Sequence, residues 1–177
     1  MVFVLGGIQM ICIYNLNNEQ HKSFIEYAFN YCDSISFIVE NYNHSINNKQ
    51  NILKDDYGNF DNNCYLHYQN TQKLIKELGM TIIRSEDNSN YGTQCYSYRS
   101  KIFYVRPNEK LKNFLRATMF ESWIFPELPE DIIMYKKNKI WVETITHERN
   151  VWIHNECKED IEFLKKQKIS FYYEGNP

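Results

Sequence analysis

The sequence predicts a single α+β domain with a mixed, mostly antiparallel sheet, about four helices and a C-terminal β-meander. Segments with helical and strand periodicity alternate along most of the chain. Two short turn signals, Lys137-Asn138 and Arg149-Asn150, follow each other near the C-terminus, and consecutive hairpins require antiparallel pairing. No internal repeat or linker-like segment divides residues 1–177, so we expect one domain.

The first third of the chain predicts a β-α-β segment and then a long loop. Residues 11–14 are apolar and rich in β-formers, which indicates a strand. Asn17 or Asn18 is a suitable N-cap for the helix that follows. Residues 34–40 predict a second strand, and the Asn-rich residues 41–63 predict an exposed loop.

The middle of the chain predicts two helices separated by two strands. A helix over 71–78 ends at Gly79, the preferred residue type just after a helix. Strands follow at 80–84 and 95–106, with a polar turn between them. The apolar spacing then predicts a helix over 108–123.

The last third predicts the meander, a helix and a closing strand. Pro126 and Pro129 favour an extended connection into it, because proline lacks a backbone donor and restricts its neighbour. The predicted elements are strands at 132–135, 139–146 and 151–154, a helix capped by Asn155, and a strand at 170–173.

Two-residue turns in the meander divide its side chains between two faces. They place Tyr135 opposite Ile140, Met134 opposite Trp141, Ile145 opposite His154 and His147 opposite Trp152. One face is uncharged and is expected to form the core: Ile133, Tyr135, Ile140, Val142, Thr144, Thr146, Val151 and Ile153. The other face mixes tryptophans with ionisable groups: Ile132, Met134, Trp141, Glu143, Ile145, His147, Trp152 and His154.

The mixed face supplies the candidate binding residues, because protein interfaces favour tryptophan beside polar groups. The alternative is that helices cover this face and its tryptophans are ordinary core. Adjacent carboxylates before the first meander strand are either an acid/base pair or a cap and edge guard. The full set is Trp123, Glu130, Asp131, Trp141, Glu143, His147, Trp152 and His154.

Catalytic and metal motifs are weak. His147-Glu148 resembles the start of the zinc-protease H-E-x-x-H motif, but position 151 is Val and the segment predicts strand and turn rather than helix. His147 and His154 are diagonal neighbours in the predicted register, and Glu143 is near, so these side chains form a candidate metal site. It lacks a dedicated third ligand. The sequence therefore predicts no metal, no cofactor and no defined catalytic set.

Composition narrows the class of partner and the compartment. The net charge of −2 gives no bulk attraction for nucleic acid. The five cysteines are odd in number and form no C-x-x-C pair, which favours a reducing cytoplasm. The apolar residues 2–5 are too few to span a bilayer. They either prolong the first strand or, with the rest of 1–9, are upstream sequence ahead of a native start at Met10.

The segment around Pro126 and the His-Glu element resemble a family of small proteins common in spore-forming Gram-positive bacteria. The shared features are Trp123, Pro126, Leu128-Pro129-Glu130-Asp131, Trp141 and His147-Glu148, with Tyr31-Cys32-Asp33 upstream. The resemblance runs from about Tyr14 onward and implies a shared fold but no activity. Some members carry the label stage III sporulation protein AH-like, which implies a sporulation-linked structural role.

The function expected from these observations is that of a non-catalytic cytoplasmic protein-binding module, of the immunity or inhibitor type, whose partner is another protein. The alternative is a small hydrolase or nuclease that uses His147 and Glu148, with metal assistance.

Overall fold

The computed structural model describes residues 10–39, 62–87, 90–91, 94–95, 100–154 and 156–174. Four α-helices and an eight-stranded sheet occur within these residues, and the predicted α+β class with a C-terminal meander is confirmed. In chain order the elements are β1 (Met10–Ile13), α1 (Asn18–Phe29), β2 (Ser34–Val39), α3 (Asn62–Glu77), β3 (Ile82–Asp87), β4 (Asn90–Tyr91), β5 (Gln94–Cys95), β6 (Lys101–Val105), α4 (Glu109–Ala117), η1 (Phe120–Ser122), β7 (Glu130–Lys136), β8 (Lys139–Ile145), η2 (Thr146–Glu148), β9 (Asn150–His154), α5 (Lys158–Lys166) and β10 (Phe171–Glu174).

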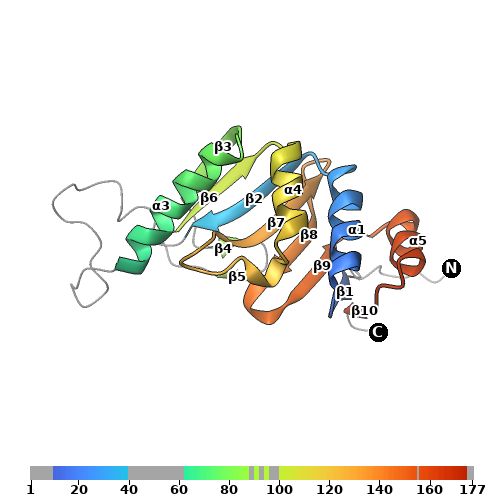
Figure 1. Cartoon of the computed structure of the whole chain (residues 1–177). Helices are drawn as coiled ribbons and strands as arrows, with labels where there is room; N and C mark the ends of the chain where they lie inside the picture. Colours follow the sequence, from blue (N-terminus) through green and yellow to red (C-terminus); the bar gives the residue numbers. More distant parts are fainter. Residues whose placement is uncertain are drawn as a thin grey trace.

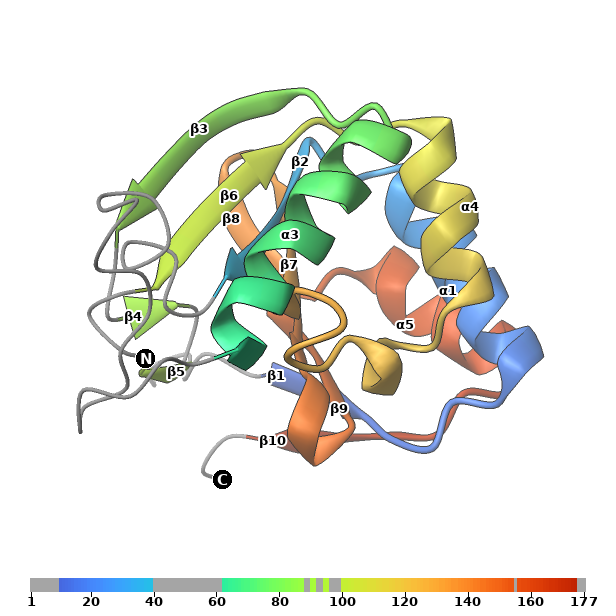
Figure 2. The same ribbon diagram turned by 60° about the vertical axis from the view of Figure 1, so that its left-hand side comes forward.

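The sheet has the strand order β10-β1-β9-β8-β7-β2-β6-β3, and every described pair of neighbours is antiparallel. The first and last strands therefore meet at one edge, next to the meander. Figures 1 and 2 show the four described helices on the same side of this sheet. The main core lies between these layers, and a smaller buried cluster around Ile133 lies on the opposite face.

Helix α1 begins where the sequence predicts. The Asn17 side chain accepts from the backbone N–H of Gln20, and the Gln20 side chain accepts from that of Asn17. This reciprocal capping satisfies two donors that a helix N-terminus leaves without partners. Phe24, Ile25 and Ala28 then point into the core, as their helical spacing predicts.

Several element boundaries differ from the prediction. Helix α3 starts at Asn62 instead of residue 71, because its buried stripe begins with two polar residues, His67 and Thr71, ahead of Leu74. Strand β3 extends to Asp87, into the predicted turn. The predicted strand 95–106 is described as β5 and β6. Residues 96–99 between them lie outside the described ranges, as do residues 1–9 and most of the predicted loop 41–63.

The boundaries around α4 and α5 also change. Helix α4 ends at Ala117 rather than near residue 123, because Thr118 is extended and the chain then forms η1. The N-cap of α5 is Cys157, not the predicted Asn155. Strand β7 begins at Glu130, two residues earlier than predicted, and β10 runs one residue further. The exact first and last residues of a helix or strand depend on tertiary contacts as well as on the local sequence.

His67 anchors α3 to the segment before β7. Its buried ring packs against Phe125 with 4.9 Å between ring centroids, and its Nδ1 lies 3.2 Å from the Pro126 carbonyl oxygen. A carbonyl only accepts, so Nδ1 carries the hydrogen. Burial, the dominant cause, lowers the pKa of His67 from 6.5 to about 4. The imidazole is therefore neutral in the folded protein at neutral pH.

This shift predicts acid sensitivity. Between pH 6.5 and about 4 the unfolded chain binds a proton at His67 that the folded chain does not, so stability is full above pH 6.5 and falls as the pH drops through this window. We expect a loss of about 3 kcal/mol from this group. Urea unfolding of wild type and His67→Gln across the window measures it, since glutamine keeps a donor for Pro126 but does not titrate. Equal pH slopes for the two proteins would refute the assignment.

Candidate functional site

The β7–β8 hairpin matches the prediction at its tip and departs from it further in. Lys137 and Asn138 have φ of 52° and 59°, as a two-residue type I′ turn requires, and Tyr135 lies opposite Ile140 as predicted. The register then shifts, so that Met134 pairs with Val142 and the predicted Met134–Trp141 pair is wrong. One extra residue on β8 reverses the facing of β7 relative to β8 beyond the bulge.

The β8–β9 connection is longer than the predicted two-residue turn. Helix η2 and the left-handed Arg149, with φ of 59°, join the strands, and Ile145 pairs with Asn150. The predicted pairs Ile145–His154 and His147–Trp152 are therefore wrong. The shift is of four residues, an even number, so Trp152 and His154 keep the face of Glu143, and Trp152 lies directly opposite Glu143.

Trp141 does not share a face with Trp152. It is only 3% exposed and belongs to the core on the helix side of the sheet. Its ring lies 5.9 Å from that of Tyr27, and Lys136 Nζ lies 4.9 Å above it. The bulge places Trp141 on this side, and so the predicted face that joins both tryptophans does not exist. The predicted core face is divided too, because Ile133 faces away from Val142.

Asp160 on α5 holds Trp141 in place. Its carboxylate accepts hydrogen bonds from Tyr27 Oη at 2.7 Å, Trp141 Nε1 at 3.3 Å, the Cys157 backbone N–H at 2.8 Å and Cys157 Sγ at 3.1 Å. Asp160 itself is buried. Burial and this hydrogen bond raise the pKa of Tyr27, so its hydroxyl stays protonated and donates. The cluster ties α1, β8 and α5 together and leaves Trp141 unavailable to a partner.

Three further candidate residues, Trp123, Glu130 and Asp131, make contacts that stabilise the fold. Trp123 is buried against Phe114. The buried Asp131 accepts from the backbone N–H of Thr146 at 2.7 Å, and Glu130 accepts from that of Phe125 at 3.2 Å. Such bonds fix the connection that leads into β7 and the start of η2 after β8. Each of the two adjacent carboxylates therefore accepts a hydrogen bond from a backbone N–H, as the cap interpretation predicts.

The His-Glu element lies in η2 at the end of the meander. The His147 side chain lies outside what the structure describes. Glu148 is exposed and accepts from Asn150 Nδ2 at 3.3 Å. No group of three or more His, Cys, Asp or Glu side chains that could hold a metal occurs in the described part of the chain.

The remaining candidates, Glu143, Trp152 and His154, lie on the neighbouring strands β8 and β9. His154 Nε2 lies 2.7 Å from Glu143 Oε2, and Glu143 is 1% exposed. The Trp152 and His154 rings are 6.3 Å apart in an edge-on arrangement. Figure 2 shows the described helices on the other side of the sheet.

Strands β1 and β10 add residues that the sequence did not single out. Cys12 lies opposite both Trp152 and Tyr172, and the rings of Tyr14 and Tyr172 are 5.8 Å apart. A hydrogen bond with Cys12 raises the pKa of Tyr172 to about 12, so this phenol stays neutral. We call Tyr14, Trp152, His154 and Tyr172 the aromatic face. The long-range pairing of β1 with β9 and β10 assembles this face, and no local pattern in these strands predicts it.

Comparison with known proteins adds no assignment. No family model matches the chain, and no curated protein or solved structure is significantly similar to it. The family resemblance and the sporulation-linked role it implies therefore stay predictions. Among the described helices, none is both long and apolar enough to cross a membrane.

Proposed function

We propose that this chain is a non-catalytic protein-binding module of the immunity or inhibitor type and that the aromatic face is its contact surface. The observation that carries the proposal is the cluster of two half-exposed tyrosines, a tryptophan and an imidazole on one sheet face. Tyrosine and tryptophan dominate the energetic centres of protein interfaces.

The sheet edge supports the same surface. Among the described strands, β10 is the last on its side of the sheet, and it carries exposed Tyr172 and Tyr173. An edge strand offers main-chain donors and acceptors that a partner strand pairs with, while side chains give specificity. The His154–Glu143 pair lies further into the sheet, on β9 and β8, and the partly exposed His154 ring is its polar group nearest to a partner.

We also propose a cytoplasmic location. Cys12, Cys32 and Cys157 are free thiols, and Cys12 is buried. Reduced cysteines are the rule in the cytoplasm, whereas secreted proteins of this size usually pair them.

A capture experiment with a matched control tests the proposal. Tagged wild type, Tyr172→Lys and Ile83→Lys are used to isolate partners from the native host. Tyr172 on β10 is 47% exposed and Ile83 on β3, at the opposite sheet edge, is 48% exposed, so both lysines cost the fold little. We expect a stoichiometric protein with wild type and Ile83→Lys that is lost with Tyr172→Lys.

Equal capture by all three proteins, or no stoichiometric partner with wild type, would contradict the proposal. An immunity or inhibitor role further requires that the purified partner lose activity when the wild-type chain is added. A hydrolytic activity of the chain itself, lost in His147→Ala or Glu148→Ala at unchanged melting temperature, would favour the hydrolase or nuclease instead.

A further inference from the structure

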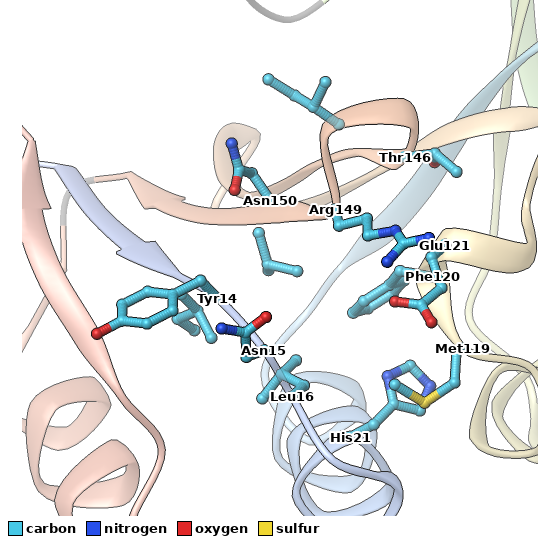
Figure 3. Close-up of a pocket in the computed structure, with 13 residues that line it drawn as sticks. Tyr14, Asn15, Leu16, His21, Met119, Phe120, Glu121, Thr146, Arg149 and Asn150 are labelled. Atoms are coloured by element: carbon cyan, nitrogen blue, oxygen red, sulfur yellow. The ribbon is translucent and has the colours of Figure 1, made fainter.

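A cavity of about 290 Å³ lies between the β1–α1 connection, η1 and the β8–β9 loop, and it shares only Tyr14 with the aromatic face. Figure 3 shows its lining, with Tyr14 and Asn15 on one side and Glu121, Thr146 and Arg149 on the other. The side chains of Leu16, Met119 and Phe120 form an apolar part of a wall that is on the whole more polar than apolar. Exposed and buried residues both line it, so the cavity opens to solvent. Its volume suits a small molecule of amino-acid size.

Two buried polar atoms in the lining have no hydrogen-bond partner within the described residues. They are Nδ1 of His21, a residue that is 1% exposed, and Oγ1 of Thr146, which is 4% exposed. Folded proteins satisfy most buried polar atoms, because an unpaired one costs free energy. The neighbouring Thr144 shows the usual case, since its Oγ1 accepts from the Ile132 backbone N–H at 2.7 Å.

The tautomer of His21 determines which kind of hydrogen-bond partner its Nδ1 needs. Nε2 lies 2.7 Å from the Leu115 carbonyl oxygen, so Nε2 carries the hydrogen. Burial is the largest cause that lowers the pKa of His21, against the opposing effect of the Leu115 and Thr118 carbonyls. The ring is therefore neutral at pH 7, and Nδ1 is a buried acceptor of a residue that lines the cavity. A ligand that complements it must present an N–H or O–H group.

The mouth of the cavity is charged and conformationally constrained. Arg149 and Glu121 are exposed side chains of opposite sign that both line it. Asn15 and Arg149 have φ of 55° and 59°, in the left-handed region. A long side chain rarely adopts this conformation, and such residues concentrate at functional sites. The two residues line the cavity from the β1–α1 connection and from the β8–β9 loop.

We propose that this cavity binds a free amino acid whose ring carries a hydrogen-bond donor, as in tyrosine or tryptophan. The ring lies against Leu16, Met119 and Phe120, and its O–H or N–H donates to His21 Nδ1 or to Thr146 Oγ1. Arg149 binds the carboxylate and Glu121 the ammonium group. The inference is independent of the protein-binding function, because only Tyr14 belongs to both surfaces.

Ligand analogues test the chemistry. The full chain is titrated with L-tyrosine, L-tryptophan, L-phenylalanine and tyramine, and binding is followed by NMR shift changes. We expect saturable binding of tyrosine or tryptophan and binding of phenylalanine that is about tenfold weaker, because phenylalanine lacks the ring donor. Tyramine, which lacks the carboxylate, should also bind more weakly. Absence of saturable binding by both tyrosine and tryptophan, or equal affinity for phenylalanine, would overturn the proposal.

Protein variants test the residues. Thr146→Val should weaken the tyrosine or tryptophan complex about tenfold and leave the melting temperature of the free protein unchanged or higher, since it removes an unpaired hydroxyl. Thr144→Val is the matched control: it should lower the melting temperature but leave affinity unchanged, because Thr144 does not line the cavity. Arg149→Asn tolerates the left-handed backbone and should weaken tyrosine but not tyramine. Unchanged affinity in both Thr146→Val and Arg149→Asn would place the binding elsewhere.

Discussion

Substitution of Asp160 by alanine is expected to lower the free energy of unfolding by about 3–5 kcal/mol. The change leaves the buried Trp141 Nε1 and the Tyr27 hydroxyl without their acceptor, and it removes the N-terminal capping of α5. A carboxylate at the N-terminus of a helix also interacts favourably with the helix dipole. Because the cluster joins α1, β8 and α5, its loss affects the packing of two helices on the sheet.

Urea unfolding measures the effect, as a lower midpoint at an unchanged slope. Tyr27→Phe is the matched control. It removes one donor and keeps the other hydrogen bonds of the carboxylate, so we expect a loss of only about 1 kcal/mol. An Asp160→Ala protein as stable as Tyr27→Phe would show that the cluster contributes no more than one ordinary hydrogen bond.

Local signals predicted the fold well. The Asn17 cap and the apolar spacing of Phe24, Ile25 and Ala28 act within a single helix, so they are legible in the sequence. The Lys137-Asn138 turn is equally local, and both residues adopt the positive φ that a two-residue hairpin needs. Antiparallel pairing of the meander followed from that turn.

The departures arise where contacts distant in sequence decide the outcome. The first turns of α3 were missed because His67 and Thr71, which are polar in type, are buried. The bulge at Trp141 has no signature in composition, and it moves one tryptophan to the helix side of the sheet. The mixed composition of the strand does not determine which face each side chain occupies.

Contacts distant in sequence also determine which residues lie together in the candidate site. Trp152, His154 and Glu143 were predicted to lie together, and they do, because the error in the β8–β9 register was even. Tyr14 and Tyr172 joined them only through the closure of β10 and β1 onto β9. The cavity at His21 and Thr146 combines residues 125 positions apart and could not be found from spacing.

The two tryptophans of the meander should respond differently to truncation. Trp141→Ala is expected to cost about 3–5 kcal/mol, because it opens a cavity beneath α1 and α5 and leaves an Asp160 oxygen with fewer donors. Trp152→Ala should cost less, since its ring is only partly removed from water. Urea unfolding of the two variants compares them directly.

Replacement by phenylalanine isolates the indole nitrogen. Trp141→Phe loses the hydrogen bond to Asp160, and we expect a loss of about 1–2 kcal/mol. Trp152 Nε1 is buried and has no hydrogen-bond partner within the described residues, so Trp152→Phe should be close to neutral. If both tryptophans instead faced the same side of the sheet, as an unbulged register requires, the two substitutions would have similar effects. Similar losses in both the alanine and the phenylalanine pairs would therefore contradict the bulge, and with it the composition of the aromatic face.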